Sequence, residues 1–317
     1  MNPHPLADSR TWPRPPFTAQ LRHLAGAAWA LGAALACGPV LAQGPVDGGT
    51  GLRTALSLTL TGAYQASSRD PADYGMPGFQ WAADAGPGPQ RRGLGWPESE
   101  LGLQASFAPG WRGVALVSLD AEEGTARAEE AYVQATGLGA GLTATGGRFL
   151  SGIGYLNAQH AHTWDFADNP LAYQVFLGTQ LAQDGVQLRW LAPTEQYLSL
   201  GLEVGRGRGY PAGARAARQP DTAALTAHTG GDIGESQSWR AGVSWLQARA
   251  TGQALALTDA QGAAAEGEFD GRTRLWVLDG VWKWAPAGNA ARTSFKLQGE
   301  YLRSSRSGSL RFDPAGA

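Results

Sequence analysis

The chain has 317 residues, with 25 Lys and Arg against 27 Asp and Glu, which gives a formal net charge of −2. Only 16% of the residues are charged, and the 45 glycines are about twice the usual share of a globular protein. This composition excludes a disordered chain, because charge is scarce and 12 Trp, 9 Phe and 8 Tyr are present, and it gives no electrostatic basis for a nucleic-acid partner.

Residues 1–42 have the pattern of a secretory signal peptide. Three arginines at positions 10–22 precede an uncharged stretch at 24–42 that is rich in Ala and Gly and ends in small residues. We predict cleavage before Gln43 and export across the inner membrane. A lipoprotein cleavage box that ends at Cys37 is the alternative for this segment. Cleavage before Gln43 removes the one cysteine of the chain, so the mature protein has no disulfide.

After residue 43 the dominant signal is alternation of apolar and polar residues, which is typical of strands with two unlike faces. It begins in residues 52–64, where leucines alternate with arginine, serine and threonine. The same alternation recurs at 101–107, 186–190, 198–204, 239–245, 276–284 and 295–301. Short turns that contain proline separate several of these runs, at 108–110, 192–194 and 286–289. Two longer, Gly-rich connections are predicted at 66–96 and 206–236.

Strands of this kind, with short turns at one end and long loops at the other, predict an all-β fold, a transmembrane antiparallel β-barrel of the outer-membrane type. Residues 43–317 would form this single domain, with about ten to twelve strands. The last residues, 313–317, have the composition of a loop, so we expect the closing strands to be missing and the barrel to be partial. A secreted β-sandwich is the alternative, but many outward positions are Ala or Gly and the inward ones are charged.

Four strings in the chain carry a family resemblance. They are Arg148–Asn157 (RFLSGIGYLN), His160–Phe166 (HAHTWDF), Asp184–Gln187 (DGVQ) and Trp282–Pro286 (WKWAP). They resemble a porin-like family of proteobacterial outer-membrane β-barrels, often labelled zinc-regulated or TonB-dependent outer-membrane receptors, with phosphate-selective and siderophore porins among its wider relatives. The similarity extends over about residues 98–310 and implies an uptake barrel, passive or energised, that continues beyond Ala317. Because the first strand begins soon after the predicted cleavage site, we expect no plug domain before it.

A channel needs fixed charges at its narrowest point, and strand alternation places charged side chains on the polar, inward face. The candidates for lining the pore are Arg148, Arg189, Glu203, Arg240, Asp279, Lys283, Lys296 and Glu300, to which Glu129 and Glu130 can be added. Their mixed signs predict a transverse field. The Gly-rich segment 150–180 could fold into the lumen as a constriction loop, with Asn157, His160, His162 and Asp165 as its candidate residues. The simpler interpretation is that each of these charged side chains only keeps the inner wall in contact with water, without selecting solutes.

These observations predict an outer-membrane, porin-like channel for uptake of small hydrophilic solutes or a chelated nutrient. We expect no enzymatic activity and no cofactor. The expected partners are outer-membrane lipid, the solute and the barrel-assembly machinery, and a homo-oligomer is compatible with the sequence. Three alternatives stay open: a TonB-dependent or siderophore and metal uptake receptor, an adhesin or structural barrel without a pore, and a lipid hydrolase that uses Ser151 with His160 or His162.

Metal binding is a weak prediction at this stage. His160 and His162 lie two residues apart with Asp165 and Asp168 nearby, a set that suits Zn²⁺ in principle. Two histidines with this spacing in a polar loop are more commonly a solvated or hydrogen-bonded pair. The sequence therefore gives no assigned metal site.

Overall fold

The computed structural model describes residues 33–36, 52–66, 79, 81–82, 93–96, 99–120, 124–166, 168–214, 220–258 and 264–312. Most of them lie in β-strands, which confirms the all-β class. Within these ranges the helical structure is limited to α1 (Leu171–Leu177) and two 3-10 turns, Ala161–Thr163 and Pro286–Gly288. No helix in these ranges is long and apolar enough to cross a membrane.

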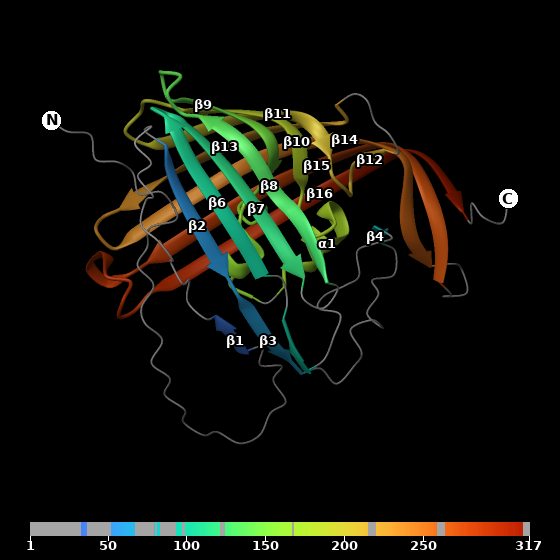
Figure 1. Ribbon diagram of the computed structural model, residues 1–317, viewed down its shortest axis with the longest axis horizontal. Coiled ribbons are helices and arrows are strands. Elements are labelled where there is room, and N and C mark those ends of the chain that lie inside the picture. Colours follow the sequence, from blue (N-terminus) through green and yellow to red (C-terminus); the bar gives the residue numbers. More distant parts are fainter. Residues whose placement is uncertain are drawn as a thin grey trace.

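A single 13-stranded sheet organises the fold (Figure 1). Its main path is formed by β2 (Arg53–Thr59), β6 (Ser99–Ala108), β7 (Trp111–Asp120), β8 (Thr125–Ala135), β9 (Leu142–Leu150), β10 (Ala182–Leu191), β11 (Tyr197–Gly207), β13 (Thr222–Ile233), β14 (Gln237–Thr258), β15 (Ala264–Trp284) and β16 (Phe295–Phe312). Each of these strands pairs antiparallel with the next in this order. Two short strands, β4 (Trp81–Ala82) and β12 (Gly213–Ala214), pair with β14. The sheet curls, so that β14–β16 cross behind β6–β8 in Figure 1.

The sheet is not closed as a barrel. Its two edge strands are β2 and β16, and in the part of the chain that the structure describes no pairing joins them. A meander in which each strand pairs with its chain neighbours closes only when the first strand meets the last. The expectation that closing strands are missing therefore stays a prediction.

The two faces of the sheet differ as the alternation predicts. On β11, Leu202 is 46% exposed on the outer face, whereas its neighbour Glu203 is 1% exposed on the inner face. On β15, Trp276 is exposed and Val277 is buried. Other large apolar side chains exposed on the outer face include Leu103, Val186, Leu188, Leu200, Val204, Leu278, Leu297 and Tyr301. In the described ranges no second sheet covers this face, which is unlike the sandwich alternative.

The later strands are longer than expected. β14, β15 and β16 contain 22, 21 and 18 residues, against the predicted strand length of about 10 for a barrel. β14 bends at a bulge between Ala250 and Gln253, where Gly252 has a φ of 62°. Beyond this bulge the β14–β15–β16 strands continue as the extension at the right of Figure 1.

The prediction of a loop at 206–236 is wrong, because Thr222–Ile233 forms β13, which pairs with both β11 and β14. Its residues are mostly Ala, Thr and Gly, so the apolar and polar positions differ too little for the alternation to be visible. The predicted turns at 108–110, 192–194 and 286–289 are confirmed as the β6–β7, β10–β11 and β15–β16 connections. Most of the loop predicted at 66–96 lies outside the described residues.

A separate small sheet is formed by β1 (Ala33–Ala36), β3 (Thr61–Gln65) and β5 (Gly93–Gly95). β3 pairs antiparallel with both of the others. β1 belongs to the predicted signal peptide, and the rest of residues 1–42 lies outside the described residues. The structure therefore leaves the predicted cleavage before Gln43 as a prediction.

Residues 151–166 and 168–181, here called the inner segment, lie between β9 and β10 and fold against the inner face of the sheet, where α1 is visible in Figure 1. The main core consists of Ile153, Leu156, Tyr173, Leu177 and Leu181 from this segment and Ala224, Leu246, Leu275 and Val277 from β13, β14 and β15. α1 ends at Gly178, whose φ of 58° is the left-handed conformation that glycine adopts at low cost. The hydrophobic core thus lies between the inner segment and the sheet.

Candidate functional site on the inner face

Glu203 of β11 fastens the start of the inner segment to the sheet. Its carboxylate accepts hydrogen bonds from Ser151 Oγ at 2.5 Å and from the backbone N–H of Gly152 at 2.8 Å. The side-chain amides of Gln183 and Gln187 each donate to it at 2.8 Å. These four donors satisfy both oxygens of a buried carboxylate. The predicted pore-lining residue Glu203 is thus placed beneath the inner segment.

Glu300 of β16 holds the next part of the inner segment in the same manner. Its Oε1 accepts from the backbone N–H groups of Tyr155 and Leu156, both at 2.8 Å, and its Oε2 accepts from Tyr173 Oη at 2.6 Å. Burial, together with the charge of Glu300, raises the pKa of Tyr173 above its usual value, so this phenol keeps its proton and acts as a donor. A second carboxylate, which is partly buried, therefore fixes both the loop and α1.

Asn157, a predicted constriction residue, closes the inner segment on itself. Its Nδ2 donates to the carbonyls of Ser151 at 2.7 Å and Leu181 at 3.0 Å, and its Oδ1 accepts from the Leu181 N–H at 2.8 Å. The side chain is fully buried. Asn157 therefore ties the two ends of the segment together, a structural role that needs no contact with solute.

The two histidines predicted for the constriction, His160 and His162, contact three glutamates of the sheet. His160 Nδ1 lies 3.4 Å from Oε2 of Glu100 on β6 and 3.5 Å from Oε2 of Glu129 on β8. His160 Nε2 lies 3.2 Å from Oε2 of Glu130. His162 Nδ1 lies 3.5 Å from the same Glu100 oxygen, and the two imidazoles stack at 5.9 Å between ring centroids. We call these five residues the His–Glu cluster.

A β-bulge in β8 explains how two consecutive glutamates reach the same cluster. Leu116 of β7 pairs with Glu130 and Val117 pairs with Ala128, so Glu129 is the extra residue between two regular pairs. Consecutive side chains of a regular strand point to opposite faces, but a bulge bends the strand and redirects a side chain. Glu129 and Glu130 therefore both contact His160 on the inner face.

The carboxylates change the protonation of His160. Burial by itself would lower the pKa of this imidazole, but the neighbouring Glu129 and Glu130 carboxylates favour the charged form more strongly and raise the pKa from 6.5 to about 10. His160 is accordingly a cation at neutral pH. It partly offsets the negative charge of Glu100, Glu129 and Glu130.

Cations gather at the opposite end of the strand order, on β14–β16. Lys296 Nζ pairs with Asp165 Oδ2 at 2.5 Å, and Lys283 lies directly across from Lys296 in the β15–β16 register. The Arg240 guanidinium and the Lys296 ammonium lie 5.4 Å and 5.6 Å from the centre of the Tyr155 ring. We call Arg240, Lys283 and Lys296 the basic group. It faces the part of the inner segment at 154–165.

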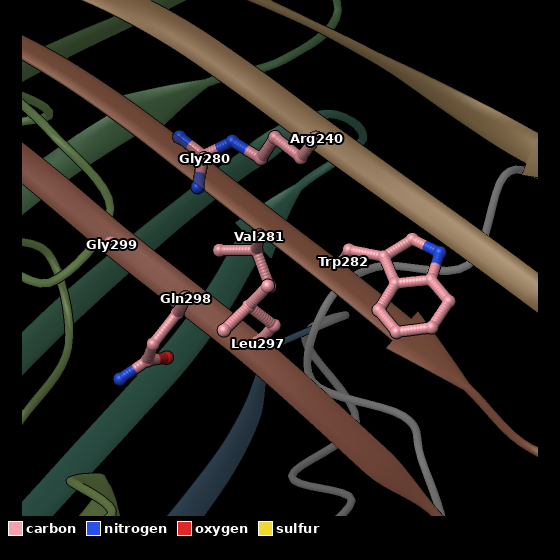
Figure 2. A pocket seen from close by; sticks show the side chains of 7 residues that line it. All are labelled: Arg240, Gly280, Val281, Trp282, Leu297, Gln298 and Gly299. Atoms are coloured by element: carbon pink, nitrogen blue, oxygen red, sulfur yellow. The ribbon is translucent and has the colours of Figure 1, made fainter.

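A pocket of about 510 Å³ opens beside this group. Its lining consists of Arg240, Gly280, Val281, Trp282, Leu297, Gln298 and Gly299. Figure 2 shows the Arg240 side chain extending from β14 toward Gly280 on β15, with Val281 and Leu297 beside it. The walls are mainly apolar, and Arg240 supplies the charge.

The remaining predicted residues lie apart from one another. Arg148, a predicted pore-lining residue, does not face inward: it pairs with Asp184 at 2.8 Å, and Asp184 has the parity of the exposed Val186 and alternates with the buried Gln183, so the pair lies on the outer face. Arg189 is exposed on the polar face of β10. Asp279 lies 3.4 Å from Nε2 of His228, across Gly242 of the strand between them. These residues do not belong to the His–Glu cluster.

Sequence reasoning missed Glu100 of the His–Glu cluster, although its position allowed the prediction. Glu100 precedes the alternating run at 101–107 and has the parity of its polar face, with Leu101 and Leu103 on the other face. Asp184, the partner of Arg148, was missed for a different reason, because it stands before the run at 186–190.

For the hydrolase alternative, the structure places the Ser151 hydroxyl against Glu203 and both histidines against glutamates.

No protein-family model matches the chain, and no solved structure matches it. An uncharacterized protein from Aquifex aeolicus (strain VF5) is 42% identical over 118 residues, which are 37% of this chain and 25% of that protein. The chain thus spans about a quarter of the length of this relative. Its name assigns no activity, and the porin-like resemblance stays a prediction.

Proposed function

We propose that the protein is an outer-membrane channel of the porin type, which lets small hydrophilic solutes or a chelated nutrient cross. The observation that carries the proposal is the division of one curved antiparallel sheet into an exposed apolar outer face and a charged inner face. Such a sheet suits lipid outside and water inside. Because hydrocarbon offers no partners to backbone groups, the edges β2 and β16 must be joined in the membrane, either to each other or through further strands.

The arrangement of charge supports conduction of polar solutes. The glutamates of the His–Glu cluster belong to β6 and β8, and the basic group belongs to β14–β16. The inner segment contacts both, through His160 on the acidic side and through Asp165 on the basic side. Opposite charges on facing walls give a transverse field at a constriction, which orients dipolar solutes as they pass.

The inner segment supports the proposal as the element that narrows the lumen. It is fixed by Glu203 and Glu300 and by its apolar core, so it keeps its place on the wall. We propose that solutes pass between this segment and the polar positions of the sheet that it leaves uncovered, such as Arg189.

Single-channel recording tests the function. The full chain, purified from outer membranes in detergent, is added to planar lipid bilayers in KCl. A channel gives discrete, stable conductance steps that a detergent blank lacks. A protein that stays in solution without detergent, or that inserts without any conductance, contradicts the proposal and favours a sandwich or a structural barrel.

A further inference from the structure

The His–Glu cluster contains two imidazoles and three carboxylates within one small region of the inner face. One ligand atom each from Glu100, Glu129 and His160 lie within 4.8 Å of one another. All three residues are partly buried. From this geometry we propose that Glu100, Glu129 and His160 bind a single divalent transition-metal ion of the Zn²⁺ type. This proposal is independent of whether the protein conducts solutes.

The distances from His160 Nδ1 to two carboxylate oxygens are the first support for a metal site. The contacts of 3.4 Å to Glu100 and 3.5 Å to Glu129 are long for charge-assisted hydrogen bonds, which are typically about 2.7–2.9 Å. Within the described part of the chain, this buried nitrogen has no hydrogen-bond partner. Ligands about 2.0–2.2 Å from a tetrahedral Zn²⁺ are themselves separated by about 3.3–3.5 Å. The two distances from the nitrogen to the carboxylate oxygens therefore match the separation of two ligands on one ion.

The other nitrogen of His160 is held in the way that a metal-binding imidazole requires. Nε2 lies 3.2 Å from Glu130, so its proton can be donated to this carboxylate. Nδ1 would lose its own proton on metal binding and give its lone pair to the ion. Such a carboxylate partner orients the ring and increases its basicity as a ligand. The bulge at Glu129 makes this possible, because it gives the ligand Glu129 and the orienting Glu130 to the same imidazole.

The donor set selects the class of ion. An imidazole nitrogen favours Zn²⁺ and its neighbours in the first transition series, whereas Mg²⁺ and Ca²⁺ prefer oxygen ligands alone. Three protein ligands leave a fourth position of a tetrahedral ion for water or for a group on a passing solute. His162, whose Nδ1 is 3.5 Å from the same Glu100 oxygen, is a second imidazole close to these three residues.

Metal titration tests the proposal. The full chain, purified in detergent without a polyhistidine tag and stripped with a chelator, is titrated with Zn²⁺ by calorimetry and with Co²⁺ by visible absorption. We expect one ion per chain and a Co²⁺ spectrum of a low-symmetry, nitrogen- and oxygen-ligated site. Glu129→Gln and His160→Asn should abolish saturable binding, and Glu130→Gln should weaken it by about 10–100-fold. Glu195→Gln, in the exposed β10–β11 turn, is the matched control and should bind as wild type does.

Heat-dependent migration on gels and tryptophan fluorescence show whether each variant is folded. If Glu129→Gln and His160→Asn fail to fold, Glu130→Gln and the wild-type stoichiometry decide. Absence of saturable Zn²⁺ and Co²⁺ binding by folded wild-type protein overturns the proposal, as does binding that folded Glu129→Gln or Glu130→Gln retains in full. In that outcome the cluster is an ion-pair network around a protonated His160. Conductance is measured separately, so failure of the channel proposal leaves this result unaffected.

Discussion

The hydroxyl of Ser151 donates a hydrogen bond of 2.5 Å to the carboxylate of Glu203, and both side chains are buried between the inner segment and β11. The contact joins residues that are 52 positions apart in the chain. Through this hydrogen bond, Glu203 of the sheet holds the first residue of the inner segment in place.

Ser151→Ala removes one of the four donors to Glu203. Hydrogen bonds to charged groups contribute about 1.5–3 kcal/mol, so we expect a loss of free energy of unfolding of about that size. Urea-induced unfolding in detergent, followed by tryptophan fluorescence, measures it, with Ser307→Ala on an exposed position of β16 as the control. Equal stability of the two variants would contradict the anchoring role. Fatty-acid release that depends on Ser151 would favour the hydrolase alternative.

Leu177→Ala tests the packing of α1 on the sheet. Leu177 is 0% exposed within the main core, whereas Leu171 of the same helix is 50% exposed. Truncation of a buried leucine leaves a cavity and costs about 2–5 kcal/mol. We expect a loss in this range for Leu177→Ala and a small change for Leu171→Ala, measured by the same unfolding assay. Similar losses for both would show that the core does not depend on this face of α1.

Gly242→Ala should disturb the inner wall locally. A Cβ at this position would overlap the imidazole of His228 and the carboxylate of Asp279, which meet across β14. Overpacking of this kind typically costs about 1–3 kcal/mol. Gly280→Ala on β15 is the matched control, because a Cβ there meets open space. Thermal unfolding of the two variants in detergent should separate them, and the prediction fails if they melt together.

The pKa of His160 predicts a pH dependence of stability in the metal-free protein. The folded-state pKa of about 10 lies above the unfolded value of 6.5, so the stabilisation is complete below about pH 6.5 and is lost as the pH rises toward 10. The difference in free energy of unfolding between wild type and His160→Gln should therefore shrink over this window. Unfolding curves recorded in chelator from pH 6 to 10.5 measure it. A difference that is constant, or that grows with pH, would show that His160 is not charged in the folded state.

Lys296→Gln should shift ion selectivity if the basic group faces the permeation path. The substitution removes a cation and releases Asp165 from its ion pair, so both effects favour cations. We expect the reversal potential in a KCl gradient to move toward the potassium equilibrium potential. Arg292→Gln, in the exposed β15–β16 connection, is the control and should leave selectivity close to that of wild type. An unchanged reversal potential would place the basic group away from the ion path.

The sequence predicts the faces of strands well where the side chains contrast strongly. In β11, leucines alternate with Ser199 and Glu203, and the structure places them as expected. β13 was missed because its Ala, Thr and Gly residues give a weak contrast. The partners of Glu203 and Glu300 could not be predicted, because they come from distant positions that only the three-dimensional path of the inner segment brings together. Glu129 and Glu130 were both candidates for the inward face, but regular alternation can place only one of two consecutive residues there. The bulge that brings both to the His–Glu cluster was not predictable from the sequence.

One extra residue in β8 decides where a charge goes. If the chain lacked Ala128, the pairing with β7 could run without a bulge, and one of the two adjacent glutamates would turn outward among leucines and valines. In the proposed membrane setting that side chain would face acyl chains, where an ionised carboxylate is poorly tolerated. A single-residue deletion at this point would thus move one glutamate from an ion pair on the inner face to an unpaired position on the apolar outer face. The number of acidic groups would stay the same.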